Sequence, residues 1–248
     1  MDALSIAFVF AAALWGAAAG LFVPRAAYRL SVAADEPWRA RCPAGHPFAG
    51  PARGWLGGSG RAACATTTAP LASPLLTALA CAALAAATGG PRPELLVWLL
   101  VAPFGTLLAW VDLRVHRLPD RLTLPLAAGV PVLLAGAALL PYAAGSWLHS
   151  LLGALALGGG YLVLFLLHPD GMGFGDVKLA VPLGAALGWY GWGVLFAGAF
   201  AGFLLGSLYG LGLVLTRRAG RGSAIPFGPF MLVGALLGLL LGAFTALP

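Results

Sequence analysis

Uninterrupted apolar runs constrain this chain more than any other feature, because a run of about 20 residues can cross about 30 Å of hydrocarbon. We expect about eight such runs, at residues 3–24, 69–89, 94–111, 121–140, 147–167, 177–188, 190–215 and 225–247. Charged residues are only 9% of the chain, too few to cover the surface of a soluble protein of 248 residues. Backbone groups inside a bilayer must be satisfied within the segment, so these runs are expected to be helices. The sequence predicts an all-α, polytopic membrane protein with about eight transmembrane helices.

The basic residues predict the orientation of the chain in the membrane. All but one of the 14 Lys and Arg residues lie in or beside the connections at 25–68, 112–120, 168–176 and 216–224. The exception is Arg92, in a short turn on the other side. Loops rich in Lys and Arg remain in the cytoplasm, so the N-terminus is predicted to lie outside. The net charge of +6 therefore reflects topology, and we expect no nucleic-acid partner.

Two regions are expected along the chain. Residues 1–68 comprise a retained first helix and a basic cytoplasmic loop, and residues 69–248 form the remaining membrane domain. The loop at 25–68 is rich in Pro, Gly and Arg and shows no helical period, which predicts an irregular segment. Gly16 and Gly20 lie four residues apart in the first run, a spacing that lets two helices pack closely.

The few acidic residues gather at the predicted cytoplasmic edge. Asp112 ends the third apolar run, where the helix dipole disfavours a carboxylate, and Asp176 stands in the glycine-rich stretch GMGFGDVK. Two other acids have ordinary structural interpretations. Asp120 follows Pro119 before a helix, as an N-terminal cap does, and Asp170 in HPDG is typical of a turn. Asp176 could also cap the helix that it opens, but capping does not explain the Gly-Phe-Gly before it. Asp112 and Asp176 are therefore the candidates for chemistry.

Two carboxylates close together share one proton, because both cannot easily ionise. One can then act as a base on water while the other, as an acid, polarises a scissile carbonyl. This chemistry predicts a membrane aspartyl protease. The alternative is an ion-coupled transporter that uses intramembrane carboxylates. Carriers tend to place such acids near the bilayer midplane and to contain inverted repeats, whereas here the acids lie at one edge.

The stretches VDLRVHRLPDRLTLP and GMGFGDVK together resemble the type IV prepilin peptidases, which are membrane aspartyl proteases with a Gly-x-Gly-Asp motif. IPFGPFM, at 225–231, also resembles the signature of the last helix in that family. The resemblance implies that Asp112 and Asp176 are the catalytic pair. The residues that match the supporting positions of the two motifs are Gly173, Gly175, Lys178, Pro119 and Asp120.

The resemblance also implies the partners. The substrate is expected to be a prepilin or pseudopilin whose short basic leader is removed at the cytoplasmic face of the bacterial inner membrane, leaving an apolar helix. Presenilin-type proteases share the Gly-x-Gly-Asp motif but have Tyr before the first acid, whereas Trp110 and Val111 precede Asp112 here. Which pilin is cleaved, and whether it serves pili, DNA uptake or secretion, stays open, as does the role of Lys178.

One part of the family pattern is broken. Many members carry two Cys-x-x-Cys pairs in the first cytoplasmic loop, a region linked to zinc and to N-methylation of the mature substrate by S-adenosylmethionine. Here Cys42 and Cys64 remain, and Gly45 stands where a second cysteine is expected. Two cysteines cannot fill a tetrahedral zinc site, even if His46 adds a third ligand. We expect no metal and no cofactor, and the broken pattern leaves N-methylation open.

Overall fold

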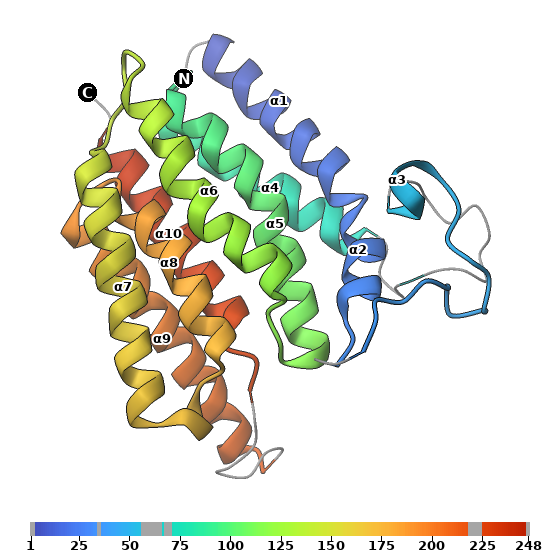
Figure 1. Ribbon diagram of the computed structural model, residues 1–248. Helices are drawn as coiled ribbons and strands as arrows, with labels where there is room; N and C mark the ends of the chain where they lie inside the picture. The colour runs from blue at the N-terminus through green and yellow to red at the C-terminus, as the bar shows by residue number, and fades with distance from the viewer. Residues whose placement is uncertain (1–2, 34–35, 56–65, 67–70, 218–224, 247–248) are drawn as a thin grey trace.

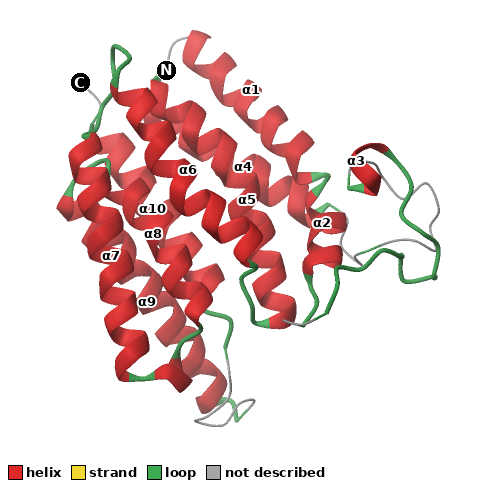
Figure 2. Ribbon diagram, viewed as in Figure 1, coloured by secondary structure: helices red, strands yellow, loops and turns green. Residues whose placement is uncertain are grey.

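The computed structural model describes residues 3–33, 36–55, 66, 71–217 and 225–246, and these residues form helices and connecting loops (Figure 2). The first half contains α1 (Ala3–Gly20), α2 (Val23–Leu30), α3 (Pro51–Gly54), α4 (Ala72–Thr88), α5 (Pro93–Val115) and α6 (Asp120–Ala138). The second half contains α7 (Trp147–Leu167), the 3₁₀ turn η2 (Pro169–Gly171), α8 (Phe174–Gly188), α9 (Trp192–Leu215) and α10 (Gly228–Thr245). The predicted all-α class is therefore confirmed.

Among the described residues, six segments are long and apolar enough to cross a membrane: α1 together with α2, and α5, α6, α7, α9 and α10. The expected spans at 69–89 and 177–188 correspond to α4 and α8, which are shorter, at 17 and 15 residues. Consecutive long helices run in opposite directions, and both described ends of the chain lie at the same end of the bundle (Figure 1). The protein is a multi-pass membrane protein, and its orientation stays a prediction.

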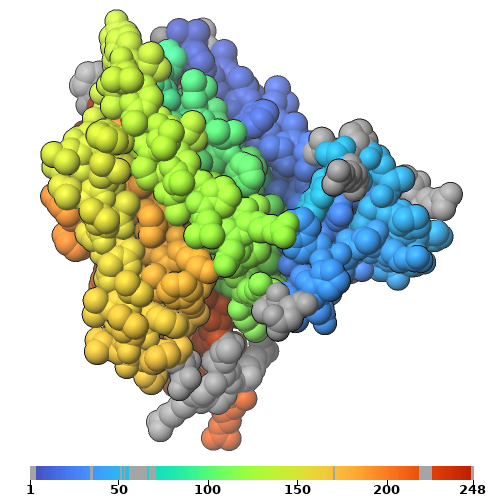
Figure 3. All heavy atoms as spheres, in the orientation of Figure 1, coloured from blue at the N-terminus to red at the C-terminus, as the bar shows by residue number. Residues whose placement is uncertain are grey.

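The first membrane segment differs from the sequence prediction. The expected helix at 3–24 ends at Gly20, and a second helix, α2, begins at Val23, so residues 25–30 are helical and the prediction of an irregular segment was wrong there. A proline near the start of α2 favours a new helix. One face of α2 also packs on α5, where Ala27 contacts the cluster around Val111. The segment that follows, 36–55, projects from the bundle (Figure 3).

The glycines of α1 allow it to pack directly against α4, as predicted. A Cβ added at Gly16 would lie 2.6 Å from the carbonyl oxygen of Thr77, and one at Gly20 would lie 2.6 Å from the Cα of Pro74. Contacts this short are not available to a larger residue. The two backbones therefore touch, which fixes the first helix to the remainder of the bundle.

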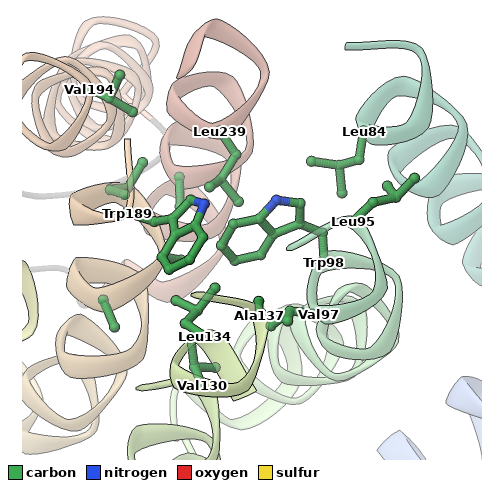
Figure 4. Close-up of a cluster of buried hydrophobic side chains, with 14 of the residues drawn as sticks. Leu84, Leu95, Val97, Trp98, Val130, Leu134, Ala137, Trp189, Val194 and Leu239 are labelled. Carbon is green, nitrogen blue, oxygen red and sulfur yellow. The ribbon is translucent and has the colours of Figure 1, made fainter. Parts of the chain in front are cut away.

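The main core lies at the end of the bundle that holds the two termini. Trp98 of α5 and Trp189, at the end of α8, point toward each other among aliphatic side chains of α4, α6 and α10 (Figure 4). Both indoles are almost fully buried. Helix α8 packs against α6, α7, α9 and α10, so it is surrounded by protein on several sides. This packing explains why a helix too short to span a bilayer alone can lie inside the bundle, and it fixes the position of its first turn.

Candidate active site

Asp112 is held by the ends of two helices that are distant in sequence. It lies in the last turns of α5, and its side chain is buried. The backbone N–H of Gly228, the first residue of α10, donates a 2.9 Å hydrogen bond to Oδ2 of Asp112. The positive end of the α10 dipole therefore faces this carboxylate. That contact offsets the unfavourable position of Asp112 at the C-terminal end of α5.

Asp176 is held within its own helix start. It lies in the first turn of α8, where the helix dipole favours a carboxylate, and its side chain is buried. The backbone N–H of Gly173 donates a 3.2 Å hydrogen bond to Oδ2 of Asp176. In the described part of the chain no further donor contacts either carboxylate. Each acid therefore has one oxygen fixed by a backbone N–H and another oxygen left for water or substrate.

The fold brings the two acids together from positions 64 residues apart in sequence (176 − 112 = 64). Asp112 interacts electrostatically with Asp176. Leu118, in the connection between α5 and α6, is close both to Gly175, the residue before Asp176, and to Gly228, whose N–H binds Asp112. Two buried carboxylates in this relation cannot easily ionise together. The fold therefore holds two buried carboxylates that repel each other at one end of the bundle.

Three glycines adjoin these acids, and at two of them an added side chain would force a neighbour to shift. A Cβ added at Gly175 would lie 3.0 Å from the Cβ of Leu118, and one at Gly228 would lie 2.8 Å from Oδ2 of Asp112. Gly173 differs, because its φ of −73° is open to other residues and an added Cβ would make an ordinary 3.5 Å contact with Asp176. Packing therefore favours glycine at position 175, and the contacts at Gly173 leave room for a larger residue.

Lys178 binds Asp120. Its Nζ lies 2.6 Å from Oδ1 of Asp120, the first residue of α6, and 4.8 Å from the centre of the Phe174 ring. The prediction that Asp120 caps α6 was wrong, because buried Pro119 occupies the cap position and no side-chain cap bond forms. The ion pair instead joins the first turn of α8 to the first turn of α6. Lys178 therefore connects α8, which carries Asp176, to the start of α6, which follows the connection that contains Leu118.

Sequence reasoning missed two neighbours of the acids. Gly228 lies in the stretch IPFGPFM, whose resemblance to a family signature was the available signal, but nothing local indicates that its N–H binds an acid 116 residues away. Tyr161 of α7 is buried and interacts electrostatically with Asp176. It follows three glycines in an apolar run, where the sequence cannot distinguish a tyrosine near the active site from one that packs in the core. Asp170 lies in the η2 turn, as predicted.

The described part of the loop after α2 contains two neighbouring candidate metal ligands, Cys42 and His46. Sγ of Cys42 lies 3.7 Å from Nδ1 of His46 in the tight turn at 42–46. A structural zinc takes four ligands, and no group of three or more candidate ligands occurs among the described residues. Cys64, the remaining cysteine of the broken pattern, lies outside the described residues. The expectation of no metal and no cofactor stays a prediction.

The family model described as the type IV leader peptidase family matches residues 98–247, which include both acids and Gly228. A prepilin leader peptidase/N-methyltransferase of Aeromonas hydrophila is 36% identical over 228 residues, covering 82% of this chain and 72% of the relative. The relative of that name from Aeromonas salmonicida is also 36% identical, over 156 residues, or 60% of this chain.

Coverage differs among the relatives. The chain spans about half the length of the Aeromonas salmonicida relative (48%). A Bacillus subtilis protein of the same name is 34% identical over 139 residues, which are 55% of this chain and 52% of that protein. No solved structure matches the chain at a comparable level of significance.

Proposed function

The chain belongs to the type IV leader peptidase family, and we propose that it is a membrane-embedded aspartyl endopeptidase that removes the short basic leader of a prepilin or pseudopilin. The observation that carries the proposal is the pair of buried acids, Asp112 and Asp176, each fixed by one backbone N–H. Relatives that cover most of the chain carry the name prepilin leader peptidase/N-methyltransferase. Their name supports this substrate class.

The proposed reaction uses the two acids in complementary protonation states. The ionised carboxylate takes a proton from water as the water oxygen attacks the scissile carbonyl carbon, and the protonated acid gives its proton to the carbonyl oxygen. The tetrahedral intermediate then collapses: the C–N bond breaks, the proton taken from water passes to the leaving amine, and a hydroxyl of the intermediate returns a proton to the acid that had given one. The N–H groups of Gly173 and Gly228 keep each carboxylate oriented throughout. The acids act as a coupled pair, so roles are not divided between them.

The proposed location is the bacterial inner membrane, with the two acids at its cytoplasmic face. The described basic residues near the site, such as Arg114, Arg117 and Arg121, adjoin the same end of the bundle, in agreement with the positive-inside rule. Arg92 is at the other end, where it donates to the carbonyl oxygen of Ala246. A basic leader would remain on the cytoplasmic side while the following apolar helix enters the bilayer, which places the scissile bond at the acids.

The transporter alternative is not favoured. Its acids would line a path through the bundle, whereas Asp112 and Asp176 lie together at helix ends. The family match also covers the segment that contains both acids. Whether the chain also methylates the mature N-terminus is a separate question, which the experiment below addresses with the same samples.

The proposal is tested by co-expressing the chain with a prepilin that has a basic leader ending in glycine. The unsubstituted protein should produce mature pilin, whereas Asp112→Ala and Asp176→Ala should leave the precursor intact. Glu36→Ala is the matched control, because Glu36 is an exposed acid outside the site, and it should process normally. Processing by either aspartate variant would overturn the two-acid mechanism. Mass spectrometry of the mature N-terminus reports methylation.

A further inference from the structure

An apolar groove leads away from the two acids along the membrane-facing part of the bundle. Its volume is about 350 Å³, and residues of α4, α5, α6, α8 and α10 line it. Thr106 is the one hydroxyl-bearing residue among those that line the groove, and its Oγ1 lies 3.2 Å from the carbonyl oxygen of Ala102 and 3.1 Å from Oγ1 of Thr77. The groove therefore offers no unsatisfied polar side chain to a ligand, and it suits an apolar one.

One end of the groove adjoins the acids. Leu108 and Leu113, on α5, flank Asp112 in sequence, and Leu179 follows Asp176 by three residues on α8. Pro229 is the neighbour of Gly228, whose N–H binds Asp112. Residues on all three helices that hold or support the acids therefore continue into the groove wall. A substrate segment that extends from the acids on this side would therefore enter the groove directly.

The groove has the length and surface expected for a helix. Beyond Trp98, which is buried in the main core, the lining on α5 runs from Val101 to Leu113, and this stretch of helix rises by about 18 Å. Ala102, Gly105 and Ala109 present small side chains at a spacing of three and four residues along this stretch, on one face of α5. Small residues at such a spacing let a second helix approach closely in a membrane, where packing drives association.

Resting on the proposed function, we propose that this groove binds the apolar helix of the prepilin substrate and thereby directs its scissile bond to Asp112 and Asp176. A leader peptidase cuts immediately before an apolar segment, so the residues after the cut must leave the acids toward the membrane. The groove begins at the acids, is apolar along its length and is bordered by exposed Leu113 and Val233. The substrate could therefore enter it sideways from the bilayer.

Filling the groove tests the proposal kinetically. An added Cβ at Gly105 has one neighbour within 4 Å, Cδ2 of Leu232 at 3.4 Å, so Gly105→Leu would project into the groove. We expect it to raise the KM for membrane-inserted prepilin about tenfold with little change in kcat, because overpacking weakens docking of the helix. Gly160→Leu is the matched control on α7, since Gly160 is exposed and its added Cβ meets nothing within 4 Å. An unchanged KM for Gly105→Leu would overturn the proposal.

Cross-linking tests it independently of activity and of any folding defect in the groove variant. A photoreactive phenylalanine analogue at Val233, in an Asp112→Asn/Asp176→Asn background, should capture the apolar segment of uncleaved prepilin. The control position is Leu204 of α9, which is similarly exposed and outside the groove lining. Adducts at Val233 with lipid alone, or equal prepilin adducts at both positions, would overturn the proposal. If prepilin is captured but the unsubstituted protein does not cleave it, the peptidase function fails; if cleavage occurs without capture, the groove assignment fails.

Discussion

Replacing Gly228 with alanine should impair the active site while leaving the fold intact. The added Cβ would stand 2.8 Å from Oδ2 of Asp112 and 3.3 Å from its Cγ, at the atom that now accepts the Gly228 N–H. Asp112 is buried in the last turns of α5, so its side chain has little room to withdraw. The carboxylate must therefore move away from the N–H, and the hydrogen bond is lost or lengthened.

The expected loss follows from the strength of that bond. A hydrogen bond to a charged group contributes about 1.5–3 kcal/mol. Because each 1.36 kcal/mol changes a rate tenfold, Gly228→Ala should slow prepilin processing about ten- to hundredfold. The fold should be less affected, since alanine favours helix over glycine and the new contact involves one side chain.

The assay compares purified variants in proteoliposomes with a prepilin substrate, together with their melting temperatures. Gly136→Ala is the matched control, because Gly136 also lies in a helix and an added Cβ there meets nothing within 4 Å. It should process prepilin at the unsubstituted rate. A wild-type rate for Gly228→Ala would refute the argument, as would a loss of rate fully explained by a lower melting temperature.

Three further predictions concern other contacts. Lys178→Ala and Asp120→Ala should each slow processing about 1.4- to fivefold, because a partly exposed ion pair contributes about 0.2–1 kcal/mol. The double variant should be no slower than either single variant in the rate assay. If the two losses multiply instead, the pair does not act as a unit. Gly20→Leu should lower the melting temperature in detergent, because its Cβ would meet the backbone of α4 at 2.6 Å; an unchanged melting temperature would contradict the close packing of α1. A zinc chelator should leave processing unchanged, since the described loop provides two candidate ligands; activity restored by added zinc would contradict this expectation.

Local patterns predicted much of this molecule. Hydropathy located each long helix to within a few residues, because a membrane span must be apolar along its whole length. Asp112 was separable from Asp170 because a carboxylate at the C-terminal end of a helix has no ordinary structural explanation, and Asp176 was separable because of the glycine-rich motif around it. The spacing of Gly16 and Gly20 likewise predicted a contact that the structure contains.

Non-local contacts could not be predicted in this way. The bond from Gly228 to Asp112 joins residues 116 apart, and the pair of Lys178 and Asp120 joins residues 58 apart. The residues that flank each partner in sequence contain no pattern that would predict either contact. The break after Gly20 was also missed, because α2 owes its burial to packing on α5. Hydropathy alone does not detect such a break, because the residues immediately on both sides of it are apolar.

The central claim is that Asp112 and Asp176 act as one catalytic unit, and the most direct test is the processing rate of Asp112→Asn, Asp176→Asn and the double variant. The exchanges keep the shape of each side chain, so folding should be preserved. Each single variant should lose activity by at least about a thousandfold, and the double variant should be no slower, because groups that act as a unit have non-additive effects. A single variant that retains a rate within tenfold of the unsubstituted protein would contradict the account.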